Sequence, residues 1–454
     1  MLGILGGRIM GSYKASFYNI YFTTDDEFYI YNTLSTAIGQ VDKTVYDYLR
    51  QNELEKISED IFNTMLEQGF IVAKKLDEKT QYLYFYNRVR YGGAARLLSI
   101  TLMPTYACNL ACPYCLEGKE KKEDMITQEQ VDAILKFAEN EIVSSRSHGV
   151  PIERMNACLY GGEPMMHKRA IIYFMDGMNS LAHKYNCKIE NFMTSNFTLV
   201  DDVMLDMIEK YRITTQITID GTKETHDRRR ITKTGKGTYD IILNNLERMK
   251  QRGINEYLSI RINIDENNID QAENIIKDVG CYSIDTYFGL LKHYKGLNDD
   301  YKGEYISQEL DNREKTIVYL NNIMRKYDHP VPEEFGKLAP CSMGIENKWH
   351  IDAYLNVYKC ELGVNHEELK VGVLTLDGEF MPNENFYRQI THSPEKMDKC
   401  LTCERLPLCG GGCTTEEYIK QGRKDANTDI PECMCSKEGL IYYLKDYVKR
   451  LKAE

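Results

Sequence analysis

Long apolar runs, a secretory signal and an excess of basic residues are all missing from this chain of 454 residues. No stretch approaches the roughly 18 apolar residues of a membrane-spanning helix, and the first residues, MLGILGGRIMGS, lack the basic segment that opens a signal peptide. We therefore expect a cytoplasmic protein with no membrane contact. The net charge of −11 argues against a nucleic-acid partner, because binding to phosphates needs a basic surface.

Cysteine is abundant, with 14 residues. Disulfides are rare in the cytoplasm, so metal binding is the leading explanation for these thiols. The segment YACNLACPYCLEG brings Cys108, Cys112 and Cys115 into one loop, and the nearest downstream histidine is His148. A structural zinc ion takes four protein ligands, whereas three thiolates on a 4Fe–4S cluster leave one iron open. The spacing therefore indicates an iron–sulfur cluster that holds a further ligand.

Strand and helix patterns alternate from residue 98 to about residue 294. The first strand pattern, LLSITLMP, leads into the cysteine loop, and five more follow, of which the last is IDTYFGLL. The helix TQEQVDAILKFAENEI opens on a capping pattern, Thr127 with Gln130. Six β–α steps predict a parallel sheet with right-handed crossovers, open or curled into a partial barrel. Active groups of such a sheet lie at the carboxyl ends of its strands, which is where the cysteine loop falls.

The N-terminal stretch has a different pattern. FYNIYFT and EFYIYN, joined by TDDE, predict a β-hairpin. KTVYDYLRQN and SEDIFNTMLEQGF predict two short amphipathic helices, and Gly69 is a candidate C-cap before the strand FIVAK. The next segment, DEKTQYLYFYNRVRYGG, is expected to be a linker or an extra pair of strands. These elements would form a compact module ahead of the sheet.

The segment CNLACPYC, with Tyr114 before its last cysteine, resembles the signature loop of radical S-adenosylmethionine (SAM) enzymes. YGGEP, TSN and TIDGTKETHDRRR, at the ends of the second, third and fourth strand patterns, match the order of that family's other motifs. The resemblance implies an α/β fold with a partial (β/α)6 TIM barrel, in which Cys108, Cys112 and Cys115 hold the catalytic cluster. It implies that SAM binds the open iron and is cleaved to methionine and a 5′-deoxyadenosyl radical. Structural thiols or a zinc site are the alternatives.

The same resemblance assigns the contacts to SAM. These residues are Tyr114, Gly161, Gly162, Glu163, Ser195 and Arg230. Arg230 suits the SAM carboxylate, because a guanidinium binds a carboxylate through two hydrogen bonds. A surface salt bridge stays open for Glu163 and Arg230, and a simple strand-end cap stays open for Ser195. Asn263 is a candidate contact to the ribose.

A second cysteine pattern, with CLTCERLPLCGGGC at its centre, resembles the SPASM domain of radical SAM enzymes. It implies two auxiliary 4Fe–4S clusters, for which zinc is the alternative. The expected ligands are Cys400, Cys403, Cys409 and Cys433 for one cluster, and Cys341, Cys360 and Cys413 for the other. The stretch HPVPEEFGKLAP before Cys341 has no cysteine, so the second cluster is expected to have an open iron. Cys435 is a spare that could replace Cys433 or reach this iron.

Two smaller expectations concern single positions. Leu355 stands where the SPASM pattern usually has a glycine, which weakens an expected tight turn but leaves the ligand spacing intact. Cys158, Cys187 and Cys281 lie in strand or helix patterns and are expected to be buried small hydrophobic residues.

The N-terminal pattern resembles the winged-helix-like recognition element of ribosomally made peptide systems. Such an element binds an extended leader peptide by adding a strand to a sheet edge, and a structural cap on the barrel is the alternative. Four parts are therefore expected. They are a leader-recognition element with linker over residues 1–95, a radical SAM core over 96–300, a helical bridge over 301–340 and a SPASM domain over 341–454.

As a set, the motifs resemble the maturases of sactipeptide and ranthipeptide precursors, including the cysteine-rich (SCIFF-type) ones. The resemblance implies an enzyme that links a cysteine sulfur to a carbon of another residue in a precursor peptide with a leader. It also implies three 4Fe–4S clusters, SAM and an external one-electron reductant, a flavodoxin or ferredoxin. Sulfatase-maturase-like oxidation of cysteine or serine, carbon–carbon crosslinking and a non-catalytic iron–sulfur carrier stay open. Glu361 stands where sulfatase maturases typically have an aspartate.

Overall fold

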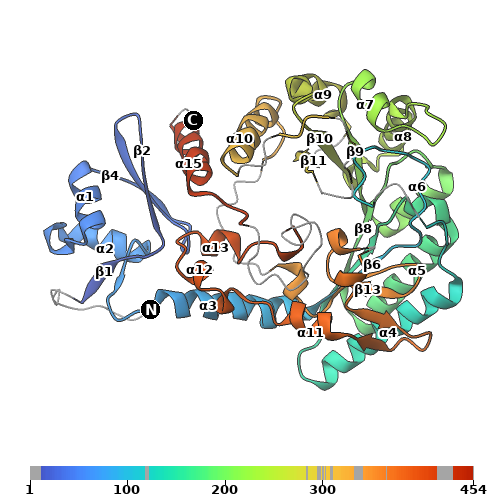
Figure 1. Cartoon of the computed structure of the whole chain (residues 1–454), viewed down its shortest axis with the longest axis horizontal. Helices are drawn as coiled ribbons and strands as arrows, with labels where there is room; N and C mark the ends of the chain where they lie inside the picture. The colour runs from blue at the N-terminus through green and yellow to red at the C-terminus, as the bar shows by residue number, and fades with distance from the viewer. Residues whose placement is uncertain are drawn as a thin grey trace.

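The structure, a computed structural model, describes residues 12–117, 122–282, 285–293, 298, 301, 303–306, 310–331, 341–364, 366–416 and 433–452. The described strands form sheets of ten, three and two strands. The large sheet curls with helices along its outside, and the N-terminal module stands to one side of it (Figure 1).

Six parallel strands make up the part of the large sheet that the sequence predicts. In spatial order they are β11 (Asp285–Leu290), β10 (Leu258–Ile264), β9 (Ile213–Ile219), β8 (Lys188–Thr194), β7 (Arg154–Leu159) and β6 (Leu97–Leu102). The crossover helices are α4 (Gln128–Ser147), α5 (Lys168–Tyr185), α6 (Asp202–Tyr211), α8 (Tyr239–Gln251) and α9 (Ala272–Val279). Thr127 and Gln130 form the predicted capping box of α4. A further short helix, α7 (Lys223–Arg229), was not predicted.

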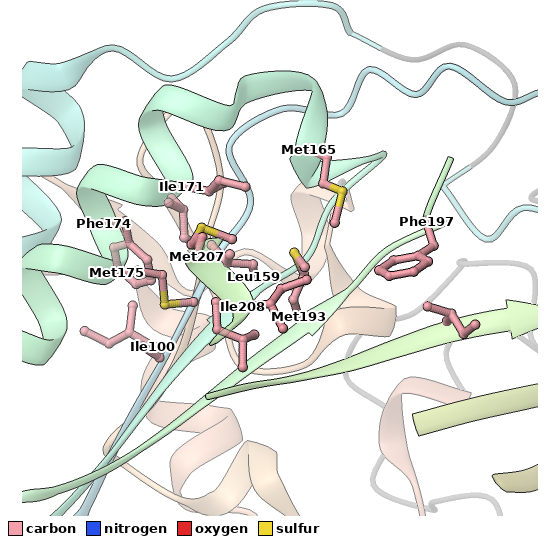
Figure 2. Packing of buried hydrophobic residues seen from close by; sticks show 14 of the residues in the cluster. Ile100, Leu159, Met165, Ile171, Phe174, Met175, Met193, Phe197, Met207 and Ile208 are labelled. Carbon is pink, nitrogen blue, oxygen red and sulfur yellow. The ribbon is translucent and has the colours of Figure 1, made fainter. Parts of the chain in front are cut away.

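Apolar side chains from the sheet and its helices form the main core (Figure 2). Leu159 of β7 and Met193 of β8 face α5 and α6, which contribute Phe174, Met175 and Ile208 to the same cluster. None of these five side chains is more than 2% exposed. Burial of each side chain contributes roughly 1.5–3 kcal/mol to the stability of the fold. The cluster therefore fixes the carboxyl ends of β7 and β8.

The C-terminal region extends the large sheet beyond β6, which the sequence does not predict. β12 (Lys348–Ile351) pairs with β6 in parallel, and β13 (Asn356–Tyr358), β14 (Gly372–Leu374) and β15 (Phe380–Pro382) follow as antiparallel neighbours. Trp349 fixes the junction, since its ring lies 5.3 Å from that of Phe137 in α4 and 4.9 Å from that of Phe380. Leu355 adopts φ +61°, so the tight turn between β12 and β13 forms without its glycine.

The N-terminal module follows the predicted order. β2 (Asn19–Thr24) and β3 (Glu27–Asn32) form the hairpin, α1 (Lys43–Gln51) and α2 (Glu59–Glu67) are the two helices, and β5 (Ile71–Ala73) is the closing strand. β4 (Ile38–Val41) pairs with β3, and β1 (Tyr13–Ala15) pairs with β5. Gly69 has φ +83° just after α2, as a glycine at a helix C-terminus requires.

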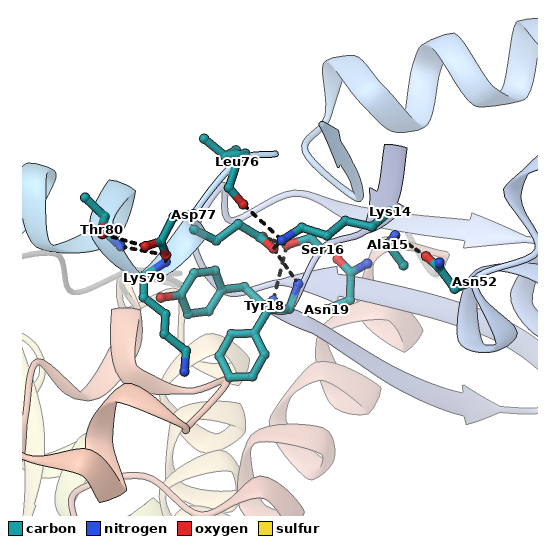
Figure 3. Close-up of polar contacts among 12 residues, drawn as sticks. Lys14, Ala15, Ser16, Tyr18, Asn19, Asn52, Leu76, Asp77, Lys79 and Thr80 are labelled. Atoms are coloured by element: carbon teal, nitrogen blue, oxygen red, sulfur yellow. Dashed lines mark hydrogen bonds and ion pairs between the residues drawn. The ribbon is translucent and has the colours of Figure 1, made fainter. Parts of the chain in front are cut away.

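Residues 78–88 form a helix, α3 (Glu78–Arg88), so the prediction of a linker or a pair of strands there is wrong. Asp77 caps the helix by accepting two backbone N–H groups of its first turn (Figure 3). Tyrosine-rich segments favour strands by propensity, but Tyr82 and Tyr86 lie one helical turn apart and are buried in one cluster. Tertiary packing of this face outweighs the local preference.

The last helix returns to the first strands. α15 (Lys437–Leu451) packs on β2 through Leu440 and Leu444, which contact the cluster of Ile20 and Phe22. It also packs against α10 (Leu310–Lys326), which lies in the expected helical bridge. Residues 332–340 of that bridge lie outside the described residues. The remaining helices are α11 (Glu384–Ile390), α12 (Asp398–Leu401) and α13 (Leu406–Cys409).

Two further expectations can be checked against the fold. Within the described ranges, no helix is both long enough and apolar enough to span a bilayer. Cys281 is exposed, so its predicted burial is wrong, because α9 ends at Val279 and Cys281 falls in the turn that follows. Cys158 and Cys187 are half-buried.

Candidate active site

A cavity of about 630 Å³ lies at the carboxyl ends of the parallel strands. Cys108, Cys112 and Cys115, from the loop after β6, form part of its wall. The other predicted residues in the lining are Tyr114, Gly161, Gly162, Ser195, Arg230 and Asn263. The fold therefore brings together almost the whole set of predicted SAM contacts, at the edge of the sheet where the sequence predicts them.

The cysteine loop gathers its three thiols at this cavity. Burial raises the pKa of Cys112 to about 12, the neighbouring Cys115 and Cys108 add to the rise, and the charge of Arg230 opposes it. Cys108 accepts two long hydrogen bonds, from the Leu110 N–H at 3.4 Å and the Asn196 amide at 3.7 Å. Clustered sulfurs that accept protein N–H groups fit the ligands of an iron–sulfur cluster. No three His, Cys, Asp or Glu side chains in the described part of the chain are placed to hold a single metal ion.

Two glycines let the chain after β7 lie directly against the start of the cysteine loop. A Cβ on Gly162 would lie 2.2 Å from the carbonyl oxygens of Tyr106 and Ala107. Gly161 has φ +126°, a conformation that other residues rarely adopt. The Glu163 N–H then donates to the Ala107 carbonyl at 2.9 Å. The YGGEP segment thus fixes the backbone that leads into the cysteine loop.

The carboxylate of Glu163 is wholly buried and binds protein groups. It accepts hydrogen bonds from the Ser195 hydroxyl (2.8 Å), the Met165 N–H (3.0 Å) and the Asn196 N–H (2.7 Å). Burial raises the pKa of Glu163, and these hydrogen bonds oppose the rise. Ser195 also accepts the Phe197 N–H at 2.9 Å, as a strand-end cap would. Glu163 therefore links the carboxyl ends of β7 and β8. Ser195 lines the cavity, whereas Glu163 does not.

Arg230, Tyr114 and Asp220 form a buried polar chain on another wall. Arg230 Nη1 donates to the Tyr114 hydroxyl at 2.9 Å, and that hydroxyl donates to Asp220. Burial raises the pKa of Asp220, and the charge of Arg230 opposes the rise. Arg230 Nε is buried and finds no hydrogen-bond partner among the residues described. Since buried donors are normally paired, this nitrogen fits a polar group of a bound molecule.

The HD pair of the HDRRR segment has a positioning role. Asp227 accepts the backbone N–H groups of Thr238 and Tyr239 at 2.8 Å each, which caps α8. His226 Nδ1 accepts the Asp220 N–H at 3.3 Å, and its Nε2 lies 3.1 Å from the Thr238 hydroxyl. Burial lowers the pKa of His226 to about 3, so its ring is neutral. Together they fix the loop that carries Arg230.

Several charged residues at the cavity were missed by the sequence analysis. Arg261 in β10 and Lys292 after β11 line it, and Asp220 supports Tyr114. Asp220 directly follows the buried strand β9, which is a recognisable signal for the active edge of a parallel sheet. Lys292 gives no such signal, because its ion-pair partner Glu416 lies 124 residues further along the chain.

Cys400, Cys360 and Cys413 each lie near other members of the set to which the SPASM resemblance assigns them. Burial raises the pKa of Cys400 to about 11, and Cys409, Cys433 and Cys403 add to the rise. We call these four residues the four-thiol group. Cys435 lies near Cys409, and burial raises its pKa.

Cys341, Cys360 and Cys413 form the other, three-thiol group. Burial raises the pKa of Cys413 to about 11, and Cys341 adds to the rise. Burial likewise raises the pKa of Cys360, with contributions from Cys341 and Cys413. The stretch without an eighth cysteine spans residues 329–340, of which 332–340 lie outside the described residues.

The three-thiol group adjoins the cavity of the cysteine loop. Glu361, the residue after Cys360, lines that cavity. The Glu416 N–H lies 3.4 Å from Cys413 Sγ, and the Glu416 carboxylate pairs with Lys292 in the cavity wall. The chain next to Cys360 and the ion pair of Glu416 thus connect the three-thiol group to the wall of this cavity, although none of the three thiols lines it.

Residues 102–279 match the family model of the Radical SAM superfamily. Several curated relatives match most of the chain, and they include a mycofactocin maturase and a sulfatase-maturating enzyme. Mycofactocin maturase MftC of Mycolicibacterium smegmatis is 23% identical over 361 residues, which are 74% of this chain and 82% of the relative. A cysteine-type anaerobic sulfatase-maturating enzyme of Clostridium novyi is 22% identical over 347 residues, 70% of this chain and 87% of the relative.

Solved structures resemble the whole architecture. Native anSMEcpe with bound AdoMet and the Cp18Cys peptide has a TM-score of 0.59 at 16% identity, over 79% of this chain and 98% of that one. Streptococcus suis SuiB bound to precursor peptide SuiA has a TM-score of 0.52 at 14% identity, over 93% and 100%.

Residues 102–279 have the radical SAM α/β fold, and the protein is an enzyme. The relatives that match most of its length include proteins named for the maturation of mycofactocin and of sulfatases.

Proposed function

We propose that this enzyme forms thioether crosslinks from cysteine in a ribosomally made precursor peptide. The observation that supports this most strongly is the three-thiol group beside the cavity of the cysteine loop. Three thiolates leave one iron of a 4Fe–4S cluster open, and a substrate cysteine is a fitting ligand for it, since bound metals deprotonate thiols. A sulfur held at this place would lie within the space where the radical is made.

The donor sets of the chain fit three 4Fe–4S clusters and SAM. Cys108, Cys112 and Cys115 would hold the cluster that supplies reductive cleavage of SAM when bound, and the three-thiol and four-thiol groups would hold the auxiliary clusters. Arg230 presents its unpaired Nε to the SAM carboxylate, and Gly162 allows close approach of the backbone. The remaining predicted contacts, Glu163 among them, act by fixing these groups in place. An external flavodoxin or ferredoxin would supply the electron.

The leader of the precursor is proposed to add a strand to β4, the edge of the three-stranded sheet. The Asn32 N–H bonds the Ala37 carbonyl at 2.9 Å, so the register directs the N–H of Gly39 to β3 and that of Gln40 outward. A groove lined by Val41, Val45, Ile61 and Met65 runs beside this edge and would accept apolar leader side chains.

Gln40→Pro removes the outward donor of β4, and Gln40→Ala retains it. If the leader pairs with β4, the proline variant should bind the precursor at least about tenfold more weakly, since one backbone hydrogen bond and its neighbours are lost. Fluorescence anisotropy with a labelled leader peptide measures this. Equal affinity of the two variants would argue against strand addition at β4.

The reaction itself can be tested with the short cysteine-rich peptide expected to be encoded beside the gene. Enzyme, SAM and reductant should release 5′-deoxyadenosine and yield a peptide that has lost two hydrogen atoms and one free thiol. A peptide that loses its sulfur and gains an aldehyde would instead establish sulfatase-maturase-like oxidation. This second candidate is favoured by the sulfatase-maturating relative, which matches the chain almost as extensively as the mycofactocin maturase.

The role of the open iron has a separate test. Selenocysteine in place of the crosslinked cysteine allows X-ray absorption at the selenium edge of the complex with SAM and peptide. An iron neighbour at bonding distance is expected. Selenium without an iron shell would leave the three-thiol cluster with electron transfer as its role.

A further inference from the structure

Three buried tyrosines lie between the N-terminal module and the four-thiol group. Tyr82 and Tyr86 belong to α3, and Tyr18 precedes β2, with ring centroids 6.4 Å apart for Tyr18 and Tyr82 and 5.9 Å apart for Tyr82 and Tyr86. Leu406 of α13 joins the same cluster, and Cys400 packs against it. Tyr82 is the central ring and is 0% exposed.

The hydroxyl of Tyr82 is buried and makes no hydrogen bond to any residue that the structure describes. Burial raises its pKa, and Cys409 and Cys400 are among the neighbours that add to the rise. The hydroxyl therefore keeps its proton and is available as a donor. Buried side-chain hydroxyls in folded proteins almost always have a partner, and Cys400, whose sulfur can accept a hydrogen bond, packs against the same cluster.

We propose that the Tyr82 hydroxyl donates a hydrogen bond to the auxiliary cluster held by the four-thiol group and thereby raises its reduction potential. A hydrogen bond to a cluster sulfur stabilises the reduced state, which carries more negative charge. The inference rests on the assignment of this cluster and does not depend on the peptide chemistry. This hydrogen bond gives α3, a helix that the sequence did not predict, a direct role in electron transfer.

The test uses full-length protein in which Cys108, Cys112 and Cys115 are replaced by alanine, so that only the auxiliary clusters contribute to the spectrum. Tyr82→Phe removes the donor and keeps the ring. Tyr84→Phe, on the same helix but 60% exposed, is the matched control. In redox titrations followed by electron paramagnetic resonance, Tyr82→Phe should lower the midpoint potential of one cluster, and Tyr84→Phe should leave both unchanged. Identical potentials in the parent and both variants would overturn the proposal.

A second measurement covers the case in which Tyr82→Phe does not fold with its clusters. Incorporation of 3-fluorotyrosine keeps every side chain in place and makes each tyrosine hydroxyl a stronger donor, so the potential of the same cluster should rise. A potential that does not move would again refute the hydrogen bond. Neither titration needs SAM or peptide, so a protein that fails to crosslink peptides can still show the shift. A parent with about four irons instead of about eight would refute the cluster assignment itself.

Discussion

At the scale of single residues, the active site depends on close backbone contacts as much as on its charged groups. Gly162 packs against the carbonyl oxygens of Tyr106 and Ala107, immediately before the first cluster cysteine. The carboxylate of Glu163 accepts hydrogen bonds from Ser195 and from backbone N–H groups. The YGGEP motif is thus a scaffold for the cysteine loop as well as a wall of the cavity.

Gly162→Ala should displace the cysteine loop, because its Cβ would meet two backbone oxygens at 2.2 Å. We expect anaerobically purified protein to lose about four irons per chain, one cluster, together with SAM cleavage. Gly92→Ala is the control, since a Cβ there meets nothing within 4 Å. Full iron content and full SAM cleavage in Gly162→Ala would show that the loop can move aside.

His226 predicts a pH dependence of stability. Its pKa is about 3 in the folded protein, because burial disfavours the charged ring, and about 6.5 when unfolded. The unfolded state therefore binds more protons, and stability is lost as the pH falls below about 6.5. When the pH falls from 7 to 5, protonation of this histidine in the unfolded state should lower the free energy of unfolding by about 2 kcal/mol.

Denaturant unfolding at the two pH values measures this loss. His226→Gln cannot titrate and should lose less stability than the parent over the same interval. His148→Gln removes an exposed histidine and should behave as the parent does. Equal pH dependence in all three proteins would contradict a neutral, buried His226.

At the scale of elements, α3 joins the N-terminal module to the rest of the enzyme. The carboxylate of Glu78, in its first turn, accepts the Ser16 hydroxyl and the Phe17 N–H (3.0 Å), and Lys14 lies 3.6 Å away. Tyr82, one turn later, belongs to the cluster against which Cys400 of the four-thiol group packs. One helix therefore carries contacts with both the proposed leader-binding module and a proposed cluster.

Glu78→Ala leaves one buried and one part-buried donor without their acceptor and should lower the free energy of unfolding by about 1–3 kcal/mol. Hydrogen exchange should become faster at Phe17 and in the first turn of α3. Glu67→Ala, at the exposed end of α2, should change neither quantity. Unchanged exchange at Phe17 in the Glu78 variant would mean that the module is held by its apolar contacts alone.

At the scale of the whole molecule, the chain closes on itself. β12 joins the C-terminal region to the first barrel strand, and α15 covers one face of β2. Removal of the N-terminal module, which carries Ile20 and Phe22, would expose their apolar partners on α15. Point changes such as Gln40→Pro are therefore cleaner probes of leader binding than deletions.

The cluster load of the whole protein is also predictable. Three 4Fe–4S clusters amount to about twelve irons per chain, and replacement of Cys108, Cys112 and Cys115 by alanine should leave about eight and abolish SAM cleavage. Iron analysis and 5′-deoxyadenosine assays measure both. A triple variant that still cleaves SAM would refute the assignment of the loop.

The sequence by itself determined the parallel sheet and the N-terminal hairpin and helices, because periodicity is a local property of the chain. The tertiary structure decided the features that depend on contacts between segments distant in the sequence. The tyrosine-rich segment 78–88 is a helix because Tyr82 and Tyr86 pack together on one face. β12 continues the barrel sheet from about 250 residues away along the chain, and Lys292 meets Glu416 across the cavity wall. Pairings between such distant segments depend on how the elements pack in space, which no local window of sequence records.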